Sequence, residues 1–286
     1  HSYFTVTYNI PRQKIPCKFL QPYFYLNPKN NIFIFQKIND MDAAIQDKIN
    51  TWLSGNYDQS VKDGIAKLQT ENPDELADSF YKNLEFGTGG LRGIMGIGTN
   101  RMNKYTVGMA TQGYANYLKL CFGDSVKVAV AHDSRNNSRF FAETVANVFG
   151  ANGIKVYLFE ELRPTPELSF AIRHFGCQGG VVCTASHNPK EYNGYKAYWD
   201  DGAQMVAPHD ENVIKEVEKI ASVDDVKWSG GEANITLIGA AVDAAYIEMV
   251  KGLSVYPEVC KAQHDLKIVY TPIHGTGIKL VPQVLA

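Results

Sequence analysis

Hydrophobic residues recur at helical spacing soon after the fortieth residue of the chain. Ile45, Ile49 and Trp52 are three or four positions apart, and this spacing predicts an amphipathic helix. Similar spacing over residues 65–68 and 76–84 predicts two further helices. We expect all three to lie on the surface, each with one apolar face packed against the protein.

Short apolar runs then alternate with helical segments. Strands are predicted at 126–131, 154–159 and 180–183, and helices at 105–120, 139–149 and 166–175. Such alternation builds an α/β fold, here a layered mixed sheet with helices on both faces. Functional residues of this fold class lie on loops at the ends of the strands.

The pattern becomes more polar after residue 205. Residues 205–255 are typical of a helix, a loop and a helix, and the last clear strand is predicted at Leu266–Tyr270. Thr271–Gly277 then forms a loop from strand to helix, and the sequence stops nine residues later. We interpret 41–235 as a first domain and 236–286 as the beginning of a second, similar α/β domain that is truncated.

The first forty residues differ in composition from the rest. They contain no Gly or Ala, nine aromatic residues and a net charge of +4, and the first methionine is Met41. We interpret 1–40 as a non-native or disordered leader. A targeting peptide is the alternative, but Pro22 and Pro28 interrupt the apolar run from Phe19 to Phe35.

Composition excludes several classes of function. The chain carries 28 Lys and Arg against 30 Asp and Glu, so no basic field is available to hold a nucleic acid. Its five cysteines lack metal-ligand spacing and a disulfide framework, which favours a cytoplasmic location. No apolar run approaches the roughly 18 to 20 residues of a membrane span. We therefore expect a small-molecule partner, no nucleic acid and no membrane.

The most informative segment is Gly180–Pro189, in which an apolar strand leads to Ser186 on a loop. Ser186 is either a nucleophile or a turn residue that satisfies local backbone groups. Acyl transfer is disfavoured because the Gly-x-Ser-x-Gly elbow is absent and His187, adjacent on an extended backbone, should point away. Phosphoryl transfer asks less of the serine, because it needs mainly correct positioning of the reacting groups and positive charge to compensate the phosphate.

A second candidate is the glycine-rich stretch Phe86–Gly96. Its glycines allow backbone amides to approach an anion, and Arg92 offers a planar, bidentate fork. The alternative is a flexible linker. The spacing fits neither the nucleotide phosphate loop nor the dinucleotide fingerprint, so ATP and NAD are not indicated.

Two further segments supply charge. Lys196 follows Ser186 by ten residues on the predicted outgoing strand of a hairpin, where it either serves the site or is solvated over aromatic rings. After the strand at 126–131 come Asp133 and Arg135, which we expect to pair and brace the site.

Five motifs occur in one order, at 86–93, 132–135, 184–189, 193–196 and 270–277. In this order they resemble the α-D-phosphohexomutase family. The doubled glycine at 89 and 90, with the Tyr-Trp-Asp-Asp-Gly-Ala-Gln string at 198–204, resembles its phosphoglucomutase/phosphopentomutase branch.

The resemblance implies an intramolecular phosphotransferase that interconverts sugar 1-phosphate and 6-phosphate, or pentose 1- and 5-phosphate. Ser186 would be a phosphoserine, and His187, Lys196 and Arg92 would be catalytic. The resemblance further implies phosphate or substrate contacts from Thr88, Gly89, Gly90, Arg92 and Asn188. Glucose 1,6-bisphosphate or an equivalent would act as activator.

The resemblance also implies Mg²⁺, bound to Ser186 through its phosphate. The other metal ligands of the family come from an Asp-x-Asp-x-Asp-Arg loop, and no such string occurs in this sequence. We therefore expect the chain to be an inactive fragment that needs the full-length protein for turnover.

Two alternatives remain open at this point. The first is a catalytically silent sugar-phosphate-binding protein that uses the glycine loop and Arg92. The second is a serine hydrolase, which the missing elbow disfavours.

Overall fold

The computed structural model describes residues 25–26, 33–34, 42–87 and 89–286. The chain divides into two compact units, His1–Ala43 and Ala44–Ala286. In the first unit, strands β1 (Tyr25–Leu26) and β2 (Phe33–Ile34) pair antiparallel. The expected leader at 1–40 otherwise lies outside the described residues and stays a prediction.

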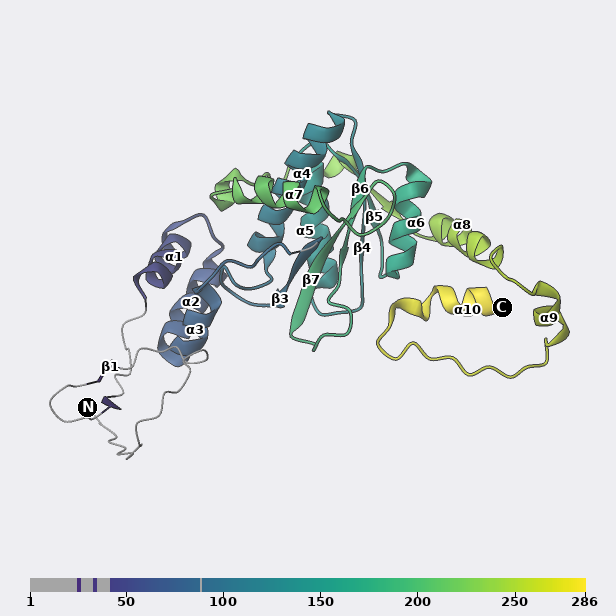
Figure 1. The fold of residues 1–286 in the computed structure, drawn as a ribbon, viewed down its shortest axis with the longest axis horizontal. Coiled ribbons are helices and arrows are strands. Elements are labelled where there is room, and N and C mark those ends of the chain that lie inside the picture. The colour runs from purple at the N-terminus through teal and green to yellow at the C-terminus, as the bar shows by residue number, and fades with distance from the viewer. Residues whose placement is uncertain (1–24, 27–32, 35–41, 88) are drawn as a thin grey trace. The chain divides into compact units, whose positions relative to one another are not determined.

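Helices and strands alternate through the second unit (Figure 1). The helices are α1 (Ala43–Ser54), α2 (Gln59–Glu71), α3 (Pro73–Phe80), α4 (Lys104–Phe122), α5 (Ser138–Ala151), α6 (Thr165–Phe175), α7 (His209–Glu218), α8 (Ala240–Lys251), α9 (Pro257–Ala262) and α10 (Leu280–Leu285). The strands are β3 (Gly90–Ile94), β4 (Lys127–His132), β5 (Lys155–Phe159), β6 (Gly179–Cys183), β7 (Tyr192–Trp199) and β8 (Ile235–Ile238). Short 3₁₀ turns lie at Val223–Asp225, Glu232–Asn234 and Thr276–Ile278.

Side-chain caps fix the beginnings of two helices. The Asn72 side chain accepts a hydrogen bond from the backbone of Glu75, and Pro73 occupies the first position of α3. Asn103 and Thr106 form a reciprocal capping box at the start of α4. These caps satisfy backbone N–H groups that have no partner within the helix.

The sheet has six strands in the order β3-β7-β6-β4-β5-β8. Strand β4 pairs parallel with β5 and β6, β5 pairs parallel with β8, and β7 pairs antiparallel with β6 and β3. The residues of β6 are all buried, as expected for a central strand covered on both faces. The sheet is therefore mixed, as predicted.

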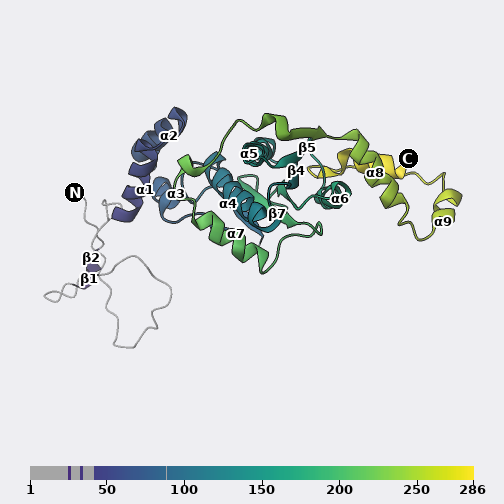
Figure 2. The ribbon, with the colours of Figure 1, turned by 90° about the horizontal axis from the view of Figure 1, so that it is seen from above.

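Helices cover both faces of the sheet (Figure 2). One face packs against α4 and α5 through a core that includes Val107, Tyr114 and Phe149. The other face packs against α6 and α8 through a core that includes Leu168 and Val242. The predicted α/β fold is confirmed, and its two cores hold β4 and β6 rigidly beneath their following loops.

Two edge strands were not predicted. Strand β3 lies within the glycine-rich stretch, and Gly90 has a φ of 156° where an added Cβ would overlap the carbonyl oxygen of Tyr195. Glycine, a poor strand former, is thus required there for close approach to β7. Strand β8 begins at Ile235, so the expected domain boundary at 235/236 falls within the sheet's outer strand. The division into domains stays a prediction.

The strand predicted at Leu266–Tyr270 is wrong. The segment has no strand assignment, and the Val269 side chain is 97% exposed. Its apolar, β-branched composition favours a strand, but a strand also needs a hydrogen-bonded neighbour, and none of the described strands pairs with it.

Among the described residues, none of the helices has the length and apolar character needed to span a membrane.

Candidate active site

Ser186 lies on the loop that follows β6, at the carboxyl edge of the parallel strands. Its φ is 55°, in the left-handed region that residues other than glycine rarely adopt. The Ser186 backbone N–H donates to the hydroxyl of Thr184 at 3.0 Å. The loop therefore holds a strained residue in place with a specific hydrogen bond.

Asp133, which follows β4, fixes the Thr184 hydroxyl that accepts this hydrogen bond. Its Oδ2 accepts from the Thr184 hydroxyl at 2.6 Å, and its Oδ1 accepts from the Ser138 hydroxyl at 2.6 Å. The backbone N–H of Asp133 donates to Cys183. Both carboxylate oxygens are therefore occupied by the scaffold, and Asp133 is a structural anchor for the serine loop.

Arg135 clamps the loop from its other side. Its guanidinium donates to the carbonyl oxygens of Asn188, Ser186, Pro189 and Tyr192 at 2.6, 2.7, 2.9 and 3.3 Å. The Nε atom lies 3.5 Å from Oδ2 of Asp133. The predicted pairing of Asp133 and Arg135 is confirmed, and it braces the loop as expected. The N–H groups of the guanidinium donate to backbone carbonyl oxygens of the loop, so Arg135 itself holds the loop in place.

His187 does not point away from Ser186, and that expectation was wrong. Its Nδ1 lies 3.3 Å from Oγ of Ser186. The left-handed turn at Ser186 brings consecutive side chains together, whereas an extended backbone would separate them. The imidazole is thus placed to exchange a proton with the hydroxyl.

Lys196 and Arg92 lie on two adjacent strands and share one face of the sheet. In the β6–β7 hairpin Lys196 is opposite Val182, and in the β3–β7 pair Arg92 is opposite Gly194. Burial lowers the pKa of Lys196, and the charge of Arg92 lowers it further. The predicted hairpin is confirmed, and it places two cations close enough to interact.

The glycine turn and Asn188 are the remaining predicted site residues. Gly87 and Gly90 exchange backbone hydrogen bonds at 2.8 and 3.0 Å, so the Gly90 N–H is already satisfied. Gly89, inside this turn, has a φ of 70°, and Thr88 lies outside the described residues. Oδ1 of Asn188 is buried and has no hydrogen-bond partner among the described residues, so it can accept from a ligand.

A cavity of about 980 Å³ opens beside Ser186 and His187. Its walls come from the segments after β4, β5 and β6 and from the segment before α10. Lys196 and Arg92 are not among the lining residues. Sequence reasoning missed Lys190, whose position directly after Pro189 was the available signal. It identified Thr271–Gly277 as a loop and as part of a family motif but did not place this loop at the site.

Comparisons with known proteins show the family of this chain. The model for phosphoglucomutase/phosphomannomutase, alpha/beta/alpha domain I, matches residues 83–224. The phosphopentomutase of Homo sapiens is 34% identical over 253 residues, and the phosphoglucomutase of Staphylococcus epidermidis is 35% identical over 242. This chain belongs to the phosphohexomutase family. Its relatives place it in the phosphoglucomutase/phosphopentomutase branch.

Solved structures of phosphohexomutases share the fold. A protein from Thermus thermophilus that bears the name phosphomannomutase aligns with a TM-score of 0.54 at 26% identity, over 63% of this chain and 38% of that one. The open form of parafusin, a Paramecium phosphoglucomutase, aligns with a TM-score of 0.52 at 17% identity over 71% of this chain and 41% of that one, which supports the fold alone. The sequence matches cover 84% of this phosphohexomutase chain and 41% of the human protein, or 83% and 43% for the staphylococcal protein.

The described residues of this phosphohexomutase do not form a metal site by themselves. They include no group of three His, Cys, Asp or Glu side chains that could hold an ion. Asp133, the carboxylate nearest to the Ser186 loop through Thr184, is already engaged at both oxygens. We therefore assign no chemical step to Mg²⁺.

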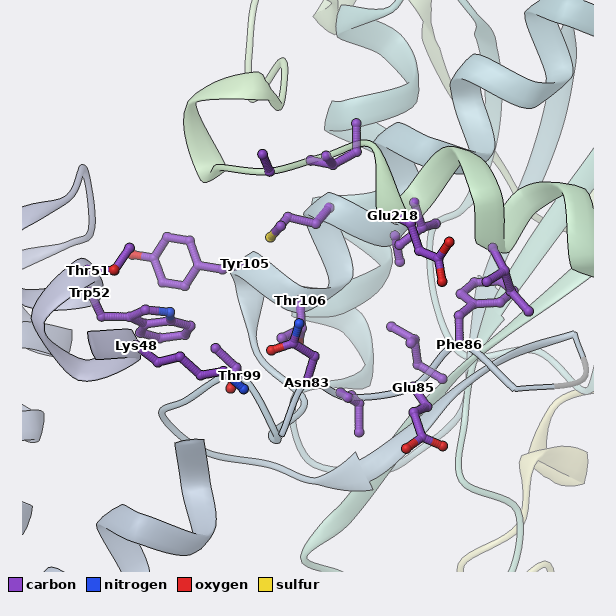
Figure 3. A pocket seen from close by; sticks show the side chains of 18 of the residues that line it. Lys48, Thr51, Trp52, Asn83, Glu85, Phe86, Thr99, Tyr105, Thr106 and Glu218 are labelled. Carbon is purple, nitrogen blue, oxygen red and sulfur yellow. The ribbon is translucent and has the colours of Figure 1, made fainter. Parts of the chain in front are cut away.

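A second cavity, of about 600 Å³, lies between α1, α4 and α7 (Figure 3). Trp52, Tyr57 and Tyr105 form one end, with ring centroids of Trp52 and Tyr57 4.4 Å apart. Phe86 and Glu218 lie toward the other end. None of the described residues predicted for the site lines this cavity.

Proposed function

We propose that this chain carries the phosphoserine of a phosphosugar mutase. The observation that carries the proposal is the Ser186 loop, which is strained, braced by Arg135 and Asp133, and open to a cavity of about 980 Å³. Relatives named phosphopentomutase and phosphoglucomutase support the same activity. The substrates are hexose or pentose monophosphates.

In the proposed reaction a sugar hydroxyl attacks the phosphorus of the Ser186 phosphate. The new P–O bond forms to the sugar, the bond to Oγ breaks, and the hydroxyl proton passes to Oγ. The sugar is then a bisphosphate, which turns round and returns its other phosphate to Ser186. His187, 3.3 Å from Oγ, is the group placed to carry the proton.

Charge compensation comes from the strands beside the loop. Arg92 and Lys196 supply fixed positive charge on one sheet face, which stabilises phosphoryl oxygens through space. Thr88, Gly89 and Gly90 are proposed as the phosphate-binding turn, and Asn188 as an acceptor for a substrate hydroxyl. These roles remain proposals for each residue.

Mg²⁺, with glucose 1,6-bisphosphate as activator, stays part of the proposal on the family resemblance. The activity is proposed for the cytoplasm. Because the sequence lacks the Asp-x-Asp-x-Asp-Arg string that supplies the other metal ligands in the family, we expect this chain alone not to turn over. A mutase assay with magnesium checks this, and appreciable turnover by the 286 residues would contradict it.

The proposal is tested by phosphopeptide mass spectrometry of the full-length protein after incubation with glucose 1,6-bisphosphate and magnesium. We expect phosphate on the peptide that holds Ser186 and its loss after excess glucose 6-phosphate is added. Ser186→Ala should abolish labelling and leave sugar-phosphate binding intact. Binding without any modification of Ser186 would instead support a silent sugar-phosphate-binding protein.

A further inference from the structure

The segment before α10 reaches the serine loop from a distant part of the sequence. The Ser134 hydroxyl donates to the carbonyl oxygen of His274 at 2.6 Å. Lys279 forms an ion pair with Glu161, and Leu280, at the start of α10, is buried. Helix α10 also packs on α8 (Figure 1). Contacts on both sides of residue 275 therefore hold this segment against the loops that follow β4 and β5.

The segment shares an unusual backbone feature with the serine loop. Ile273 has a φ of 51°, and Ser186 has a φ of 55°. A left-handed β-branched residue is rare and persists only where its surroundings hold it. Here the Ile273 N–H donates to the Thr271 hydroxyl and the Gly275 N–H donates to Pro272. Both strained residues line the same cavity.

The basic side chains of this cavity fall into two groups. Arg135 is bound to backbone carbonyls, and Arg163 donates to both carboxylate oxygens of Asp243 at 2.7 and 2.8 Å. Lys190 and His274 also line the cavity, and neither side chain has a hydrogen bond or ion pair with any described residue. Their donors are therefore available to a ligand.

We infer that the 272–278 segment is the second wall of the Ser186 cavity and that His274 binds a phosphate of the substrate there. An imidazole N–H of His274 donates to a phosphoryl oxygen, opposite His187 on the serine loop. His274 lines the cavity directly after Ile273, whose backbone is left-handed. This inference rests on the proposed function, because it assumes that the cavity receives a phosphorylated sugar.

Histidine NMR tests the inference without turnover. The 286-residue chain contains seven histidines, and their Hε1 signals are assigned by single His→Gln variants. On titration with glucose 6-phosphate we expect saturable shifts of the His187 and His274 signals. His264, which is exposed and outside the cavity, is the control and should not shift.

The matched variants are His274→Gln and His264→Gln. We expect the first to raise the dissociation constant for glucose 6-phosphate about tenfold, as for loss of one charged hydrogen bond, and the second to leave it unchanged. A shift at His187 without one at His274, or unaltered affinity in His274→Gln, overturns the inference and leaves the proposed function standing. Absence of any saturable shift at His187 and His274 overturns both.

Discussion

Replacing Arg135 by lysine should release the serine loop while keeping the positive charge. Arg135 makes four hydrogen bonds to loop carbonyls, and a lysine ammonium cannot span that set. If lysine keeps one of the four hydrogen bonds, the loop loses the other three, which is about 3 kcal/mol of stabilisation at about 1 kcal/mol per hydrogen bond. The left-handed conformation of Ser186 costs roughly 1–3 kcal/mol, so the loss is enough to let the loop relax.

Hydrogen exchange measures this release directly. The Ser186 amide donates to Thr184, and the Asn188 amide donates to Ala185, so both are protected only while the loop keeps its shape. A loss of about 3 kcal/mol predicts exchange about a hundredfold faster at these two amides. The Thr184 amide, which donates to Gly194 within the sheet, should exchange at an unchanged rate.

The control substitution is Arg139→Lys. Arg139 is exposed, pairs with Glu143 on the next turn of α5 and donates to the carbonyl oxygen of Glu160 after β5, and neither partner belongs to the serine loop. It should leave loop exchange unaltered, because an exposed pair on a helix contributes only a few tenths of a kcal/mol. Unchanged exchange at the Ser186 and Asn188 amides in Arg135→Lys would refute the view that this guanidinium holds the loop.

Three further substitutions test the scaffold by denaturation. Gly90→Ala should destabilise the fold by more than about 2 kcal/mol, because the added Cβ would overlap a backbone carbonyl. Gly123→Ala, where the Cβ would enter open space at a φ of 74°, should cost only about 1 kcal/mol. Equal losses of unfolding free energy in urea would contradict this. Thr184→Val should lower stability by about 1–3 kcal/mol, since it removes the hydroxyl that donates to Oδ2 of Asp133 and accepts from the Ser186 N–H. A thermal midpoint equal to that of the wild type would argue against this. Burial raises the pKa of the Glu167 carboxyl to about 8. Folding therefore favours its protonated form, and the contribution is present below the ordinary value near 4.5 and is lost as pH rises toward 8. Glu167→Gln should flatten the fall in stability between about pH 5 and pH 8, and an unchanged slope would refute the assignment.

The central strands could be predicted because burial on both faces leaves continuous apolar runs. Strand β6 is such a run, and β4 is nearly so. The edge strands β3 and β8 carry no such pattern, since β3 is glycine-rich and half of β8 is exposed. Leu266–Tyr270 shows the reverse error, because its composition suits a strand while no described strand pairs with it. The composition of a segment indicates whether its side chains can be buried. Whether the segment pairs as a strand depends on the rest of the fold.

The site divides in the same way. The Ser186 loop and the bracing role of Asp133 and Arg135 could be predicted, because each follows a buried strand and such loops meet at one edge of a sheet. The direction of the His187 side chain could not be predicted, because it depends on the left-handed backbone of Ser186, a residue that is not glycine. The approach of His274 to Ser134 joins positions 140 residues apart, and no local pattern specifies it.

The charges around Ser186 separate into those that hold the loop and those that face the ligand. Arg135 and Asp133 are fully engaged with the protein, whereas Lys190 and His274 have no partner among the described residues. A serine that gains and loses a phosphoryl group changes its charge by nearly two units in each cycle. A loop held by cations that also bound this phosphate would change shape whenever the group left. Because Arg135 donates to carbonyl oxygens, whose charge is constant, the proposed phosphorylation of Ser186 would leave the loop in one conformation, and the side chains of Lys190 and His274 would remain available to the phosphate.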